Sequence, residues 1–385
     1  MDAVTLARMA NADTAFAFDL YHQLPAPPVN AFFSPYSIAA ALTKTHAGAR
    51  GLTAEQIASV LHLPFAEGRM HEVRWQLDAD LAAADESLVI RVANSLWLQA
   101  GYPFRDEFLE LVGGWHAAAV EVVDYIKAAE GARLALNTWV EEHTEGKIRD
   151  LVPPGGVDAM TRLALVNAIY FYGTWVHQFD AASTRPEPFH LLDGPPREVP
   201  LMEQTEEFRY GEGDGWRAAR LPYRGRASML VVVPDEGCFA DVEARFGPDL
   251  LAEVREALEL RQLHLALPRF ELTCALELGA ALSALGMVDL FDPRRADLTG
   301  MTAVRELFVS EVFHQAFVAV DERGTEAAAA TAVVIRRTSL RIVPPAELIV
   351  DRPFLLAIEH EPSGELLFLG RVIDPTASQH PPDQA

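Results

Sequence analysis

The sequence predicts an α+β protein that folds as a single domain. Patterns with a helical period come mostly in the first half of the 385-residue chain, and strand-like runs come mostly in the second half. Half of the residues are hydrophobic, so a sizeable core can be buried. No Pro/Gly/Ser-rich linker, internal repeat or low-complexity block divides the chain, which favours one domain.

Six segments have the pattern of a helix. The first ends at the prolines of residues 25–28, because proline cannot continue a helix. The third begins with Thr53 and Gln56, which have the spacing of a capping box. The fifth is amphipathic and ends at Gly146, and the sixth ends at Gly286. We expect helices at 2–23, 37–48, 53–61, 108–116, 129–144 and 276–285.

Seven segments have the pattern of a strand. Residues 88–98 alternate between two faces, and residues 162–171 form a nearly continuous apolar run, as in a sheet buried on both faces. The glycine-rich stretch 211–215 is acidic and leads into Trp216, so we expect a hairpin turn there and not a phosphate site. We expect strands at 88–98, 162–171, 229–233, 263–267, 311–320, 355–359 and 365–371.

The composition excludes several classes of partner. A net charge of −23 argues against nucleic acid and against anionic membranes, which both require basic patches. No apolar stretch of about 18 residues predicts a membrane-spanning helix. No signal peptide is visible, so we expect a soluble chain, either cytoplasmic or secreted with its signal absent from this sequence. Cys238 and Cys274 could form one bridge, but free buried thiols are favoured.

Motifs of the common enzyme classes do not occur. The sequence has no Gly-x-Ser-x-Gly elbow, no His-Glu-x-x-His and no Gly-x-x-x-x-Gly-Lys. The 12 histidines show no metal-ligand spacing, and His264 with the single Cys274 does not make a zinc site. We therefore expect no enzyme activity, no metal and no cofactor.

Residues 322–335 give conflicting local signals. Their Gly-Thr-Glu start and four alanines favour a helix, whereas their Thr-Ala-Val-Val-Ile end favours a strand. Such a conflict suits a segment that exists in two states. As a strand, one face carries only uncharged side chains, small at first and then apolar: Thr325, Ala327, Ala329, Thr331, Val333 and Ile335. The opposite face carries Glu326, Ala328, Ala330, Ala332 and Val334.

Seven further motifs occur in order between residues 30 and 375. They are residues 30–38, 136–148, 165–169, 267–270, 285–287, 296–298 and 368–372. Together with the 322–335 segment they resemble the serpin family of serine protease inhibitors, most of all its bacterial members. The resemblance implies a domain over 1–375 with a large central mixed β-sheet, two further sheets, eight or nine helices and an exposed reactive loop at about 322–345. It leaves 376–385 as a C-terminal tail.

The resemblance also implies a mechanism. The partner would be a serine protease, captured in a covalent complex by a suicide substrate whose cut loop enters the main sheet. Counting about seventeen residues from Glu322 places the attacked bond between Thr338 and Ser339, which suits a chymotrypsin-, elastase- or subtilisin-like enzyme. The loop is about four residues longer than usual, and other counts give Arg337 or Arg341, which suit a trypsin-like enzyme. A non-inhibitory carrier or storage protein with the same fold is the alternative.

The family's hinge and sheet-opening residues can be assigned on this sequence. The hinge is Glu322, Gly324, Thr325, Glu326, Ala327, Ala328, Ala329, Ala330 and Thr331. The resemblance implies that Ser34, Ser37, Asn167 and His314 form a hydrogen-bond network that holds the central strands together. It also implies that Glu322 meets Arg269 beside Trp175. The acidic segment 69–86 argues against glycosaminoglycan activation, and we expect a monomer.

Overall fold

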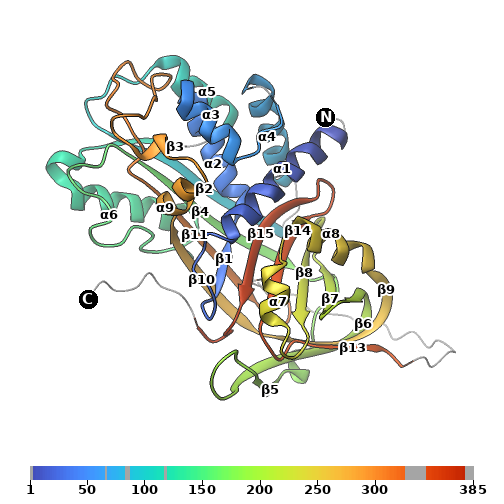
Figure 1. Ribbon diagram of the computed structural model, residues 1–385. Helices are drawn as coiled ribbons and strands as arrows, with labels where there is room; N and C mark the ends of the chain where they lie inside the picture. The colour runs from blue at the N-terminus through green and yellow to red at the C-terminus, as the bar shows by residue number, and fades with distance from the viewer. Residues whose placement is uncertain (1–2, 66, 83–86, 117–118, 326–343, 378–385) are drawn as a thin grey trace.

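The computed structural model describes residues 3–65, 67–82, 87–116, 119–325 and 344–377. Its strands form two sheets, and most helices lie at one end of the molecule (Figure 1). The architecture is α+β, as the sequence predicts.

The central sheet has six strands in the order β10-β11-β12-β4-β2-β3. It is mixed: β11 pairs with β4, and β2 with β3, in parallel, while β10–β11 and β2–β4 are antiparallel. Its strands are β10 (Phe270–Glu277), β11 (Glu311–Val320), β12 (Gly324–Thr325), β4 (Leu163–Thr174), β2 (Leu88–Gln99) and β3 (Ala119–Val123). The apolar run at 162–171 therefore becomes the buried middle strand β4.

The other strands form one sheet in which the two further sheets expected from the resemblance are joined. The seventeen-residue β6 pairs with β9 along one edge and with β5 and β7, at its two ends, along the other, which connects both regions. The order is β1-β15-β14-β8-β7-β6-β9-β13. The bounds are β1 (Ala31–Phe33), β5 (Arg185–Phe189), β6 (Arg197–Gly213), β7 (Trp216–Pro222), β8 (Ala227–Pro234), β9 (Glu259–Pro268), β13 (Ala346–Ile349), β14 (Phe354–His360) and β15 (Glu365–Val372). The glycine-rich stretch forms the β6–β7 hairpin, as predicted.

Nine α-helices occur within the described ranges. They are α1 (Ala3–Tyr21), α2 (Pro35–Gly48), α3 (Gly51–Val60), α4 (Glu67–Ala82), α5 (Asp106–His116), α6 (Tyr125–His143), α7 (Phe239–Ala244), α8 (Pro248–Ala257) and α9 (Gly279–Ala284). Helix α6 covers one face of the central sheet: its Leu136 and Val140 share a buried cluster with Val166 of β4 and Phe313 of β11. Helices α7 and α8 lie beside the second sheet (Figure 1). None of the described helices has the length and apolar character needed to cross a membrane.

Two local predictions were wrong in detail. Helix α3 begins at Gly51 without a side-chain cap, because Thr53 Oγ1 accepts a hydrogen bond from Asp297 N–H and Gln56 Oε1 accepts one from Asp289 N–H. These polar groups tie the helix to a distant segment instead of closing a capping box. Helix α9 is shorter than expected because residues up to Glu277 continue β10, whose pairing with β11 prevails over their helical pattern.

The C-terminal tail begins against the body. Arg197 forms an ion pair with Asp374 at 2.6 Å and donates to Thr376 Oγ1 at 2.8 Å. Residues 378–385 lie outside the described residues, so the division at residue 375 stays a prediction.

Candidate functional site

The site begins where the chain leaves β11 and turns back into the central sheet. Asp321 makes this turn: its N–H donates to the Gly324 carbonyl at 2.8 Å, and its carboxylate accepts from Arg323 N–H at 2.8 Å and from Gly324 N–H at 3.2 Å. The two residues of β12 then lie between β11 and β4 and run antiparallel to both. The start of the predicted hinge is thus already a strand of the sheet.

Gly324 allows this close approach. It pairs with Thr174 of β4, and a Cβ atom at position 324 would lie 2.0 Å from the Gly173 carbonyl oxygen. Any side chain at this position would push the hinge out of the sheet, because the clash is with backbone.

A buried hydroxyl pair fixes the next residue. Thr325 is 0% exposed, and its Oγ1 lies 2.7 Å from the hydroxyl oxygen of Tyr223. The Tyr223 ring stacks on Trp175, with ring centroids 4.2 Å apart and planes 11° apart. Burial raises the pKa of Tyr223 far above its usual range, so the phenol stays neutral and can donate or accept in this bond. This contact fixes the end of β12 at the point where it lies between β4 and β11.

Trp175 has the position that the resemblance implied. Its indole Nε1–H donates to the Asp321 carbonyl at 3.0 Å, and its backbone N–H donates to the Arg323 carbonyl at 2.9 Å. Trp175 therefore stabilises the turn at residues 321–324 through hydrogen bonds from both its side chain and its backbone.

The expected meeting of Glu322 with Arg269 is wrong. The Glu322 carboxylate accepts a hydrogen bond from Thr184 Oγ1 at 2.7 Å, and its carbonyl accepts from Phe179 N–H at 2.8 Å. Arg269 is exposed at the junction of β9 and β10, with its N–H bound to the Pro200 carbonyl. Within the described ranges no ion pair joins Arg269 to Glu322. The hydrogen bonds of Glu322 are made instead with Thr184 and Phe179.

Further along the same strand pair, β4 and β11 contact each other directly. They pair in parallel over seven positions, from Glu311 with Ala164 to Phe317 with Tyr170. His314 lies opposite Asn167 in this register. Any strand that enters the sheet from β12 must separate these two residues.

The predicted network forms around His314 and Asn167. Ser34 N–H donates to His314 Nε2 at 3.1 Å, and the other ring nitrogen bonds to Asn167 Oδ1. The Asn167 amide donates to the Ser37 carbonyl at 3.0 Å and also contacts Ser37 Oγ. Ser34 caps α2, since its Oγ accepts from Ser37 N–H at 3.2 Å. The N-terminus of α2 thus fastens both middle strands.

These partners define the protonation state of His314. Nε2 accepts from a backbone N–H, so the proton of the neutral ring lies on Nδ1 and points to Asn167 Oδ1. A second proton would put two donors face to face at Ser34. Burial lowers the pKa of His314 to about 3. The ring is therefore neutral at physiological pH, and the network acts as a neutral clamp.

The structure adds residues that sequence reasoning missed. Asn94 of β2 lies opposite Asn167 and accepts from its amide, which extends the clamp to a third strand. In the sequence, Asn94 is the single amide on one otherwise apolar face of the predicted strand at 88–98. Tyr223 and Thr184 gave no local signal, because both act on the hinge from segments distant in sequence.

The remaining site predictions lie outside the described residues. These are the bond between Thr338 and Ser339, the alternatives Arg337 and Arg341, and the hinge residues Glu326, Ala327, Ala328, Ala329, Ala330 and Thr331. Cys238 and Cys274 are both free; Cys274 is buried as expected, whereas Cys238 is partly exposed.

Comparisons with known proteins agree with this geometry. A family model described as "Serpin (serine protease inhibitor)" matches residues 11–375. The leukocyte elastase inhibitor of Sus scrofa is 39% identical over 382 residues, which cover 96% of this chain and 100% of that protein. An uncharacterized serpin-like protein of Thermococcus kodakarensis is 37% identical over 371 residues, covering 95% of this chain and 86% of that protein. These relatives are mammalian and archaeal, so the likeness to bacterial members stays a prediction.

Solved structures share the fold along nearly the whole chain. Uncleaved ovalbumin superposes with a TM-score of 0.87 and 27% identity, covering 95% of this chain and 100% of ovalbumin. Human thyroxine-binding globulin complexed with thyroxine superposes with a TM-score of 0.88 and 28% identity, covering 97% and 100%. The extent of the family match, the relatives above 30% identity and the hinge geometry lead to one conclusion: this chain belongs to the serpin family.

Proposed function

We propose that this chain inhibits serine proteases as a suicide substrate. The protease serine attacks the Thr338 carbonyl, the bond to the Ser339 nitrogen breaks, and Thr338 remains esterified to the enzyme. The cut loop then enters the central sheet between β4 and β11 and carries the protease with it. The observation that supports this proposal is β12, whose two residues already lie between those strands.

The strand directions favour complete insertion. In the intact molecule β4 and β11 share one parallel ladder. A strand that continues β12 would run antiparallel to both, so one parallel ladder is exchanged for two antiparallel ladders. Insertion therefore adds backbone hydrogen bonds to the sheet. Release of stored strain by loop insertion is the general behaviour of inhibitory serpins, and the proposal extends it to this chain.

The sequence of the inserting face suits a fast reaction. Thr325 is already buried in the sheet, and in a strand that continues β12 the residues Ala327, Ala329 and Thr331 would follow it on the same face. Protease turnover is about 1–10³ s⁻¹, so insertion must finish within roughly milliseconds to a second. Small uncharged side chains meet the least resistance in a packed interior.

The target we propose is an elastase-, chymotrypsin- or subtilisin-like enzyme. Counting from Glu322 makes Thr338 the residue that enters the protease pocket, and threonine suits a small or permissive pocket. Several similar relatives are named leukocyte elastase inhibitors, which supports this choice. Arg337 or Arg341 would instead direct the chain to a trypsin-like enzyme.

The test is separate incubation with pancreatic elastase, chymotrypsin, subtilisin and trypsin. We expect a complex that survives SDS and a released peptide that begins at Ser339. A peptide that begins at Thr338 or Ile342, with a trypsin complex, would keep the mechanism and move the target. Cleavage without a complex by all four enzymes would refute inhibition and favour the non-inhibitory alternative.

A further inference from the structure

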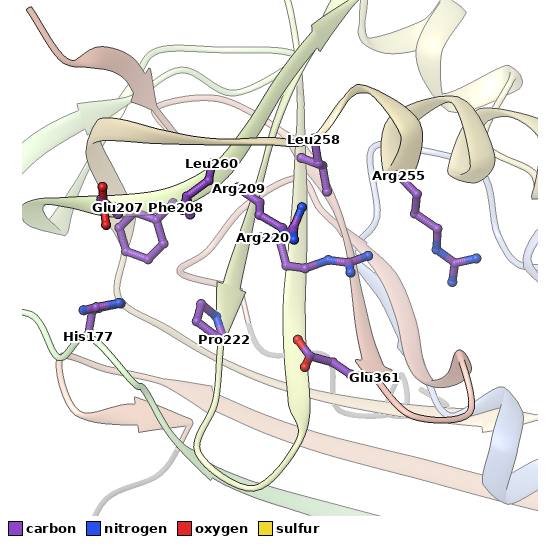
Figure 2. A pocket seen from close by; sticks show the side chains of 10 residues that line it. All are labelled: His177, Glu207, Phe208, Arg209, Arg220, Pro222, Arg255, Leu258, Leu260 and Glu361. Carbon is purple, nitrogen blue, oxygen red and sulfur yellow. The ribbon is translucent and has the colours of Figure 1, made fainter. Parts of the chain in front are cut away.

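A pocket on the second sheet is lined by none of the hinge or clamp residues described above. It has a volume of about 460 Å³, within the range typical of sites for small molecules. It lies where β6, β7 and β9 meet the end of α8, and Figure 2 shows the side chains that line it. They are His177, Glu207, Phe208, Arg209, Arg220, Pro222, Arg255, Leu258, Leu260 and Glu361.

Three of these side chains are arginines, and their charges are only partly balanced. Arg220 and Arg255 share one carboxylate: Arg220 lies 2.6 Å from one oxygen of Glu359, and Arg255 lies 2.7 Å from the other. Two arginines share this single carboxylate, so the three side chains carry a net charge of +1 beneath the pocket. Glu359 itself is 3% exposed. The Nε of Arg220 is buried and has no hydrogen-bond partner. A buried donor without an acceptor is costly, and a shift of the Arg220 side chain toward a bound anion would satisfy it.

Arg209 adds a second positive charge in an unfavourable place. It lies directly opposite Arg220 in the β6–β7 register, where like charges repel. Across the described ranges, the Arg209 side chain makes no hydrogen bond or ion pair with protein. The adjacent pair costs stability in the empty protein, and an anion between the two guanidinium groups would reverse that cost.

The other residues that line the pocket restrict the kind of ligand that it can bind. Phe208, Pro222, Leu258 and Leu260 supply apolar surface, and Leu260 keeps 63% of its surface exposed. Glu207 and Glu361 are exposed carboxylates at the same pocket, and neither forms an ion pair with Arg209. These two negative charges and the chain's net charge of −23 oppose a polyanion. A single anionic group with an apolar body fits better.

We propose that this pocket binds a small aromatic carboxylate, with its carboxylate between Arg209 and Arg220 and its ring against Leu260. The probe is 1-naphthoate, and 1-naphthamide is its neutral counterpart of nearly the same shape. Isothermal titration calorimetry on the intact chain measures both. We expect saturable binding of one naphthoate per chain, and binding of naphthamide at least about tenfold weaker, because only the anion engages charged donors.

Two variants and one control variant locate the site. Arg209→Gln removes the unpaired guanidinium, and we expect naphthoate to bind about five- to tenfold more weakly. Arg269→Gln is the matched control, since Arg269 is an exposed arginine outside the pocket. Leu260→Ser should weaken both probes. The proposal is overturned if naphthoate does not bind at about 5 mM, if naphthamide binds equally well, or if the two arginine variants behave alike.

Discussion

Replacing Thr325 with arginine should turn the inhibitor into a substrate. Thr325 is fully buried between β4 and β11, with its hydroxyl on Tyr223 and its backbone against Gly173. An arginine there must either bury an unpaired charge or keep the hinge out of the sheet. Even after relaxation, burying such a charge costs several kcal/mol. The arginine therefore keeps the hinge out of the sheet in the uncut protein, so its burial is deferred to the insertion step, and a cost of about 3 kcal/mol there slows insertion by roughly 10²-fold.

The slower insertion predicts what fraction of reactions with the protease ends as a complex and what fraction as cleaved chain. If insertion normally outruns hydrolysis of the acyl-enzyme about tenfold, a roughly hundredfold slower insertion leaves about one encounter in ten as a complex. The assay titrates a fixed amount of protease with each variant and measures complex and cleaved chain on a denaturing gel. Thr325→Ser is the matched control, because it keeps the hydroxyl. Equal complex formation by Thr325→Arg and Thr325→Ser would refute the reasoning.

The hinge contact and the buried histidine give two more predictions. Tyr223→Phe removes one buried hydrogen bond, worth about 1–2 kcal/mol, so amide exchange of residues 321–325 should be about 5- to 30-fold faster by mass spectrometry; unchanged exchange would contradict this. The pKa of His314 is lowered to about 3, so between about pH 6.5 and pH 3 the unfolded chain binds a proton that the folded chain does not, and stability falls as pH falls. From pH 7.5 to 5 this loss is about 2 kcal/mol in urea unfolding. His314→Gln, which cannot titrate, should lose about 2 kcal/mol less over the same range, whereas an equal loss would contradict the assignment.

The sequence predicted elements with strong local patterns. The apolar run of β4 and the alternation of β2 specified these strands, and their polar exceptions, Asn167 and Asn94, became the clamp. Because a polar group in a buried strand must find a partner, such residues mark contacts even where the partner is unknown.

Contacts between distant segments could not be derived in this way. Tyr223 reaches Thr325 only because β7 ends beside the mouth of the central sheet, and Thr184 satisfies Glu322 in place of Arg269. Thr53 and Gln56 have the spacing of a helix cap, yet both side chains bind the segment around 289–297. In each case tertiary packing supplied a better partner than the local sequence.

Opening of the β4–β11 ladder is the central claim, and a disulfide across it tests that claim most directly. Ala168 and Gln315 are partners in this parallel register and both are buried. Neighbouring strands lie about 4.8 Å apart, within reach of a disulfide. The variant carries Ala168→Cys and Gln315→Cys, with Cys238→Ser and Cys274→Ala to remove the native thiols.

The measurement compares complex formation with a target protease in the oxidised and the reduced variant, with each single-cysteine variant as a control. If the loop must enter between β4 and β11, the oxidised protein should be cleaved without forming a complex, and reduction should restore the complex. A complex that forms equally well with the disulfide intact would contradict the account.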